Sequence, residues 1–119
     1  MSIDNPFNGF KTIKEYAKRN NARAAYVTKA VQLSRKYFQT SQSWVRNSPL
    51  ERLKLNNINH SGTDFYISAV TNDEFGFNEG DILLANALYN QGAKVQWEFL
   101  NGNHCDINQE SLANFFLDL

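Results

Sequence analysis

The chain has 119 residues, and its 12 Lys and Arg side chains balance 12 Asp and Glu side chains, so the formal net charge is zero. This balance gives no electrostatic reason to expect nucleic acid or an anionic membrane surface as a partner. Hydrophobic residues make up 42% of the sequence, which is enough for a packed core, and the single cysteine excludes an internal disulfide or a multi-cysteine metal site.

Localisation signals and cofactor motifs are not visible in the sequence. The start of the chain lacks the basic and apolar segments of a secretory signal, and no apolar run reaches the roughly eighteen residues that a membrane helix needs. We therefore expect a cytoplasmic protein with no membrane span, no metal and no other cofactor.

The first half of the chain is predicted to be helical. Apolar residues recur at helical spacing from Lys11 to Asn20, and again from Asn21 or Ala22 to Phe38. In the second of these helices the expected buried stripe is Tyr26, Ala30, Leu33 and Tyr37. The polar stretch 40–43 is typical of caps and turns, and Trp44 and Val45 follow it as an expected buried pair.

A short third helix is predicted from its start signals. Ser48 is the expected cap, Pro49 occupies the first helical position, and Glu51 follows Ser48 by three residues. This helix is expected to end before Asn56 and Asn57.

The second half has the pattern of a β-α-β-α unit. Strands are predicted over Asp64–Val70 and Lys94–Leu100, with helices over Glu79–Gln91 and about Asn108–Leu117, and Gly92 is the expected left-handed helix cap. The apolar helix residues expected to be buried are Ile82, Leu83, Ala85, Leu88, Tyr89, Leu112, Phe115 and Phe116. A strand, a crossover helix and a second strand imply parallel strands and the α/β class.

Two parallel strands are too few for an independent sheet, because parallel sheets have both faces covered and usually contain several more strands. We therefore expect one incomplete domain, with a helical segment over 1–60 and the β-α-β-α unit over 61–119. The missing sheet would come from another chain, through self-association or pairing with a partner, unless the helical half wraps a very small sheet.

Two polar residues follow the predicted strands directly. Asp73 comes just after the first strand and His104 just after the second. Sites in open α/β sheets gather at the carboxyl ends of the strands, and neighbouring strands lie about 4.8 Å apart. A carboxylate beside an imidazole at this edge would fix the tautomer of the histidine and support its work as a general base.

The second half resembles the C-terminal part of α/β-hydrolase serine esterases. The resemblance is carried by an Asp-Glu pair after the strand in Ile67–Gly80, by the helix residues Leu83–Leu88, by the last-strand start Gly92–Val95, and by a Gly-x-His turn in Gly102–Cys105. It covers about Phe65 to Leu119. It implies a partial α/β-hydrolase fold in which the segment Met1–His60 corresponds to the helical cap of such enzymes.

In this family the chain order is nucleophile, acid, histidine. The resemblance implies that Asp73 is the acid and His104 the general base, while the Gly-x-Ser-x-Gly nucleophile segment is absent from the sequence. The chain is thus expected to be a C-terminal fragment of a carboxylic-ester hydrolase, inactive alone, that would act on a small ester once an N-terminal half completes it. A peptidase of the same fold stays open. The alternative function is a non-catalytic interaction or oligomerisation domain derived from a hydrolase scaffold.

Three neighbouring residues allow other assignments. Glu74 is the possible alternative acid, and Asp106 could contact His104, although we expect it to cap the last helix. Adjacent residues on an extended segment point to opposite sides, so Cys105 is expected to be a small buried residue and not a nucleophile paired with His104.

No serine is a credible nucleophile, because Ser48 is expected to cap a helix and Ser68 lies inside a strand. His60 is expected to be an exposed loop residue. We expect the aromatic residues of the helical half to pack in the core or cap, where some could line an acyl pocket: Tyr16, Tyr26, Tyr37 and Trp44.

Overall fold

A computed structural model of the chain consists of a two-stranded parallel sheet with six helices, and it describes residues 12–56, 58 and 62–119. The elements in chain order are α1 (Ile13–Arg19), α2 (Ala24–Tyr37), α3 (Ser41–Asn47), α4 (Pro49–Leu55), β1 (Asp64–Asn72), α5 (Asn78–Asn90), β2 (Lys94–Asn103) and α6 (Gln109–Leu117). The predicted mixed α/β class and the parallel strand direction are confirmed. The predictions for Asn57 and His60 lie outside the described residues.

Side-chain caps set the starts of the short helices. The Thr12 hydroxyl accepts a hydrogen bond from the Glu15 amide at the start of α1. The Thr40 hydroxyl does the same for Ser43, so that α3 is a helix where only a turn was predicted. Ser48 and Pro49 take their predicted places at the start of α4, but the Ser48 side chain makes no capping hydrogen bond.

The buried face of α2 differs from the predicted stripe. Val27 and Val31 are buried, with Val27 only 1% exposed, whereas Leu33 is 41% and Tyr37 is 69% exposed. Apolar residues lie on more than one side of this helix, and its contact with α1 decides which side is covered. The stripe predicted from sequence spacing therefore lies on a different side of α2 from the side that is buried.

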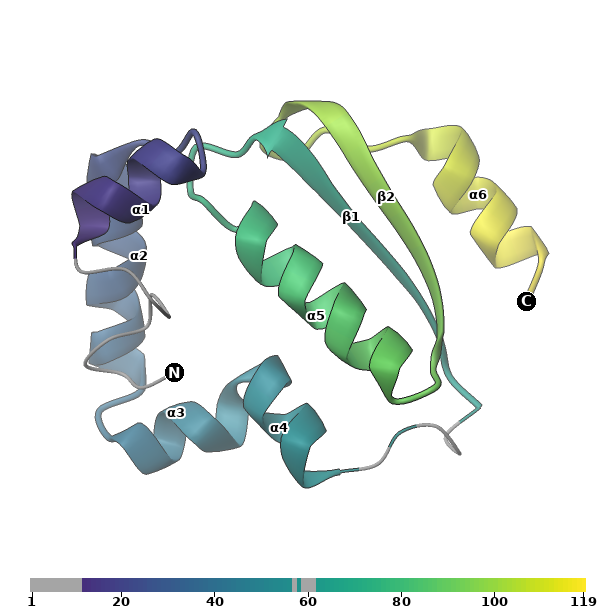
Figure 1. Cartoon of the computed structure of the whole chain (residues 1–119), viewed down its shortest axis with the longest axis horizontal. Coiled ribbons are helices and arrows are strands. Elements are labelled where there is room, and N and C mark those ends of the chain that lie inside the picture. Colours follow the sequence, from purple (N-terminus) through teal and green to yellow (C-terminus); the bar gives the residue numbers. More distant parts are fainter. Residues whose placement is uncertain (1–11, 57, 59–61) are drawn as a thin grey trace.

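The sheet has a helix on each of its two faces. Helix α5 packs against β1 and β2 through the buried residues Ala85 and Leu88. On the other side, the ring of Phe115 in α6 lies 5.6 Å from the ring of Tyr66 in β1. Figure 1 shows α5 and α6 on opposite sides of the paired strands, with α1 to α4 arranged beyond α5.

The narrow sheet leaves much of the apolar surface of its helices uncovered. Gly92 follows the end of α5 in the predicted left-handed conformation, with a φ of +84°, and the Ala93 amide donates to the Leu88 carbonyl at 3.1 Å. Several residues expected to be buried are instead at least 38% exposed: Ile82, Leu83, Tyr89 and Phe116. Two strands are too narrow to cover a whole helix face, which is why these predictions were wrong.

Candidate functional site

Asp73 and His104 meet at the carboxyl ends of the two strands. The His104 Nδ1 atom lies 3.0 Å from the Asp73 Oδ1 atom, in hydrogen-bond contact. The Asp73 side chain is 6% exposed and the His104 side chain 31% exposed, so the carboxylate is buried while the imidazole reaches the surface. A carboxylate can only accept hydrogen bonds, so this contact places the proton of a neutral imidazole on Nδ1 and leaves Nε2 free to take one up.

An irregularity in the strand pairing aligns these two residues. The register begins with Asp64 opposite Lys94 and continues to Val70 opposite Leu100, and then shifts so that Asn72 lies opposite Asn103. One extra residue in β2 therefore accompanies the last two residues of β1. Because side chains alternate faces along a strand, this bulge changes which side chain of β2 turns towards Asp73.

The bulge is built around Gly102 and Thr71. The Thr71 hydroxyl donates to the Asn101 side-chain oxygen at 3.1 Å and accepts from the Gly102 amide at 3.3 Å. A Cβ atom on Gly102 would lie 2.6 Å from an oxygen of Asp106. Glycine inside a strand is a common sign of a bulge, and this was the sequence signal that we did not use.

The turn after β1 holds the acid in place. The Phe75 amide donates to Asp73 Oδ1 at 2.9 Å, and the Gly76 amide donates to the Asp73 carbonyl at 3.0 Å. Gly76 has a φ of +73°, a conformation that glycine adopts without steric cost. The same carboxylate oxygen thus bonds both the turn and His104, which fixes the orientation of the acid.

Two predictions for the turn that carries His104 were wrong. Asp106 does not cap α6: its Oδ2 atom accepts from the Asn103 amide at 2.8 Å, and Asn108 caps the helix instead. Cys105 is exposed rather than buried, with a φ of +71°. Both differences have one cause, because the chain makes a tight turn immediately after β2 and does not continue as an extended segment.

Two phenylalanine rings form a wall beside the imidazole. The ring centre of His104 lies 4.7 Å from that of Phe75 and 5.8 Å from that of Phe77. The Phe75 ring is in turn 5.1 Å from the ring of Tyr26 in α2. Sequence spacing gave no indication of this apolar wall, which limits the access of water to one side of His104.

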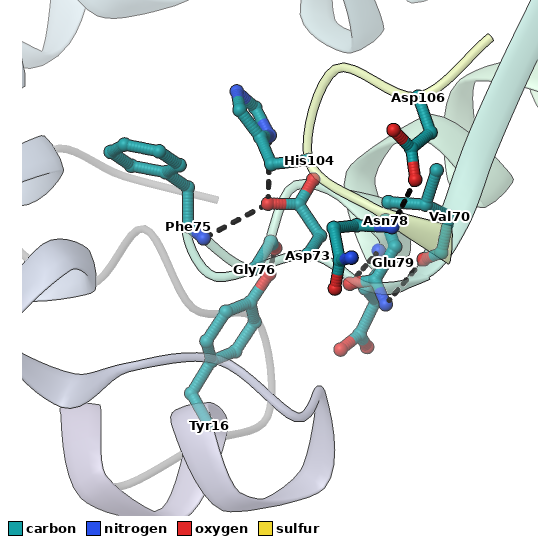
Figure 2. A network of polar contacts seen from close by, with 10 residues as sticks. Tyr16, Val70, Asp73, Phe75, Gly76, Asn78, Glu79, His104 and Asp106 are labelled. Atoms are coloured by element: carbon teal, nitrogen blue, oxygen red, sulfur yellow. Dashed lines mark hydrogen bonds and ion pairs between the residues drawn. The ribbon is translucent and has the colours of Figure 1, made fainter. Parts of the chain in front are cut away.

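Residues at the corner between α1 and α2 form hydrogen bonds with the turn that holds Asp73. The Tyr16 hydroxyl donates to the Gly76 carbonyl (Figure 2), and the Arg23 amide donates to the Glu74 carbonyl at 2.8 Å. The Glu74 carboxylate lies 3.9 Å from the Arg23 guanidinium, so this alternative acid is directed to α2 while Asp73 contacts His104. The helical half therefore positions the candidate site as well as covering it.

Burial, together with the carboxylates of Glu79, Asp73 and Asp81, raises the pKa of Tyr16 to about 12. The hydroxyl therefore keeps its proton at neutral pH and remains the donor to the Gly76 carbonyl. Asp81 was not identified as a site residue from the sequence, and Tyr16 was expected only to pack in the helical half, where it could line an acyl pocket. Both belong to helices whose position relative to Asp73 is set by tertiary packing.

Asp81 lies in the first turn of α5, beside a cavity of about 380 Å³. This open cavity, which we call the Trp44 cavity, is lined by residues of α1, the α3–α4 pair and the start of α5, including Tyr16, Trp44, Phe77 and Asp81. Burial and the nearby Asp73 carboxylate raise the pKa of Asp81 to about 6, against an opposing effect of His104. An acid perturbed in this way beside a cavity is a common feature of functional sites.

Replacing Asp81 by Asn is expected to stabilise the protein at neutral pH. The folded state holds the Asp81 proton from its ordinary pKa of 3.8 up to about 6, so the contribution of Asp81 to the free energy of unfolding should fall as the pH rises through this window. The shift would correspond to about 3 kcal/mol for a fully buried group, and because the half-buried side chain is screened by water we expect about 1 kcal/mol. Urea unfolding across this pH range measures the effect.

The matched control is Asp118→Asn, at an exposed position after α6. The difference in unfolding free energy between this variant and the wild type should not follow the pH dependence expected for Asp81→Asn, which should gain on the wild type as the pH rises from about 4 to about 6. A variant of Asp81 that is less stable than wild type at neutral pH would contradict the expectation.

A larger cavity, of about 490 Å³, lies away from the dyad. It is lined by residues of α4 and α5 and by Phe65 and Ile67 from the first half of β1. Asp73 follows the opposite end of this strand, and strands extend by about 3.3 Å per residue, so we assign no role in the chemistry of the dyad to the larger cavity.

No protein-family model matches this chain, and no curated protein or solved structure matches it significantly. Within the described ranges, no group of three or more His, Cys, Asp or Glu side chains is arranged to hold a metal ion. Among the helices that the structure describes, none is long and apolar enough to cross a membrane.

Proposed function

We propose that the chain is the acid-and-histidine part of a serine carboxylic-ester hydrolase with a partial α/β-hydrolase fold. In the complete enzyme, His104 would act as the general base and Asp73 would orient it during acyl transfer through a serine ester. Small esters are the proposed substrates once an N-terminal half completes the enzyme, and the chain alone is proposed to be inactive.

The single observation that carries the proposal is the buried Asp73 carboxylate in contact with His104 Nδ1. The pair lies at the carboxyl ends of neighbouring parallel strands, where sites of open α/β sheets form, and a bulge adjusts the strand register at this point. Acid before histidine is also the chain order of the family that the sequence resembles.

The proposed partner is an N-terminal half that supplies the nucleophile and the missing sheet. In the part of the chain that the structure describes, β1 pairs with β2 alone, so its other edge is unpaired. Such an edge presents free amide and carbonyl groups to an incoming strand. A strand added there would lie next to β1 and bring its own carboxyl end to the edge that holds Asp73 and His104.

The test is labelling of the purified chain with a fluorophosphonate, read by intact mass. The chain is labelled alone and after co-expression with the N-terminal half of a serine esterase that contains Gly-x-Ser-x-Gly. We expect an adduct only in the second sample, located on the esterase half, and its loss in His104→Ala. A stoichiometric adduct on the 119-residue chain alone would overturn the fragment proposal.

The second candidate function is a non-catalytic interaction or oligomerisation domain. The exposed, stacked rings of Trp97 and Phe99 on β2, 6.2 Å apart, favour it together with the unpaired edge of β1. The test is the mass of the chain alone in solution, measured by analytical sedimentation. A stable oligomer, together with no fluorophosphonate labelling in any co-expression, would support this alternative.

A further inference from the structure

Strand β2 has a free edge with an exposed apolar surface beside it. Within the described ranges β2 pairs with β1 alone, so its outer edge offers unpaired amide and carbonyl groups. Large apolar residues of α5 and β2 are at least 38% exposed on the face of the sheet that α5 covers: Ile82, Tyr89, Trp97 and Phe99. Apolar clusters of this kind on a surface commonly mark sites of protein association.

A hollow of about 300 Å³ lies between α5 and β2 at this edge. Its lining comes from α5 and from Val95 and Trp97 of β2, with no contribution from β1. The α5 residues Leu84 and Leu88 instead line the larger cavity together with residues of β1. The hollow therefore lies on the side of α5 away from β1, where a further strand added to β2 would fit.

The opposite face of β2 carries two charges of opposite sign. Glu98 accepts hydrogen bonds from three side chains, which fix its carboxylate in place and lower its pKa: Tyr66, Ser111 and Asn108. Lys94 lies on the same face, because residues four apart on a strand point the same way, and its side chain is 73% exposed. One positive and one negative charge thus have defined positions along the free edge.

Two copies of β2 are complementary in one antiparallel register. A two-fold axis perpendicular to the sheet places one residue opposite its own copy, and with Gln96 on the axis Lys94 faces the partner's Glu98. The symmetry forms this pair twice, and opposite charges that face each other across two strands are stabilising. With Trp97 on the axis, Lys94 would face the partner's Leu100. With Glu98 on the axis, two carboxylates would face each other.

The register centred on Gln96 also matches the apolar face. Trp97 then lies opposite the partner's Val95, and Phe99 lies opposite the partner's Ala93. Each large ring therefore faces a smaller side chain. Because Val95 lines the hollow beside α5, the partner's Trp97 is placed at the hollow, where its ring would be covered.

We propose that two copies of this chain associate through β2, in an antiparallel pairing centred on Gln96, to form a continuous four-stranded sheet. The strand order is β1-β2-β2-β1, with the α5 helices of both copies on the same face. The free edge of β1 remains available to the N-terminal half, so the inference does not depend on the proposed function.

The test of the register is a disulfide between two copies. Gln96→Cys is made in a Cys105→Ser background, since Cys105 is exposed, and is treated with oxidised glutathione. Directly opposite residues of an antiparallel pair have Cα atoms about 4.5–5.5 Å apart, within the reach of a disulfide. In the register centred on Trp97, the two Gln96 positions would be roughly 8 Å apart, which is too far for a disulfide.

We expect Gln96→Cys to form a covalent dimer, and Lys29→Cys, at an exposed position of α2, to remain monomeric in a denaturing gel. In analytical sedimentation the wild type should have twice the mass of one chain. Lys94→Glu should weaken this association about ten-fold, because both facing pairs become pairs of like charges. Lys29→Glu makes the same change of charge away from β2 and should leave the dimer unchanged.

A wild-type chain that is monomeric at about 0.1 mM, or an oligomer in which Gln96→Cys forms no disulfide, would overturn the proposal. These two results are informative even if Lys94→Glu does not fold. A dimer without any fluorophosphonate adduct on co-expression would support this interface and count against the hydrolase. An adduct in a complex that holds only one copy of this chain would support the hydrolase and reject the interface.

Discussion

Replacing Asp73 by Ala is expected to lower the rate of acylation in the proposed complete enzyme by about 10⁴-fold. The substitution removes the acceptor for His104 Nδ1 and also leaves the Phe75 amide without its partner. The imidazole then loses both its fixed orientation and the negative charge that stabilises its protonated form. The rate of fluorophosphonate labelling with the co-expressed N-terminal half measures this loss.

The isolated chain offers a second measurement of the same interaction. A proton on His104 Nδ1 that is bonded to Asp73 should give a downfield NMR signal in the wild type, and Asp73→Ala should eliminate it. Asp73→Asn should largely retain the signal, because an amide oxygen can replace the oxygen that accepts from both Phe75 and His104. Its labelling rate should nevertheless fall, because the charge is lost.

The neighbouring acid is the control for these variants. Glu74→Gln keeps the backbone contact with Arg23 and removes only a surface ion pair at 3.9 Å, so labelling should change less than two-fold, as expected for a pair worth less than about 0.5 kcal/mol. If Glu74→Gln abolished labelling and Asp73→Ala did not, then Glu74 would be the acid and our assignment would be wrong.

Gly76→Ala is expected to destabilise the fold by about 3 kcal/mol. A side chain at a φ of +73° costs about 1–2 kcal/mol in backbone strain. In addition, the new Cβ atom would lie 2.8 Å from Tyr16 Cε1 and 3.2 Å from the Ala22 Cβ atom, and such overpacking costs about 1–3 kcal/mol. Urea unfolding at equilibrium measures the loss.

Gly62→Ala is the matched control, because Gly62 has a similar φ of +68° and a Cβ atom there would have no neighbour within 4 Å among the described residues. It should cost only the backbone strain, about 1 kcal/mol. The difference between the two variants measures how tightly α1 is packed on the turn that holds Asp73. Equal losses would mean that α1 moves away without cost and does not position the site.

The helical half therefore has two roles around the dyad. Tyr16 and Arg23 hold the turn that contains Asp73 by bonding backbone carbonyls, and Trp44 forms part of a cavity next to Phe77. Simple coverage of the dyad would not require these contacts with the turn that holds Asp73. Substitutions in α1 are consequently expected to affect both stability and catalysis of the completed enzyme.

Local sequence determined most of the secondary structure. The four predicted elements of the second half occur with small shifts at their ends, because Gly92, Asn108 and the alternating strand residues carry strong local preferences. The placement of Asp73 and His104 directly after two strands also followed from the sequence, since parallel strands end at the same edge of a sheet.

Tertiary structure decided the features that depend on contacts between distant segments. The buried side of α2 was set by its packing against α1, and the exposure of Ile82 and Leu83 by the width of the sheet. The bulge that aligns His104 with Asp73 arises from the pairing of β1 with β2. The cavity that joins Trp44 to Asp81 depends on helices brought together by packing, and side-chain spacing along one segment carries no information about such distances.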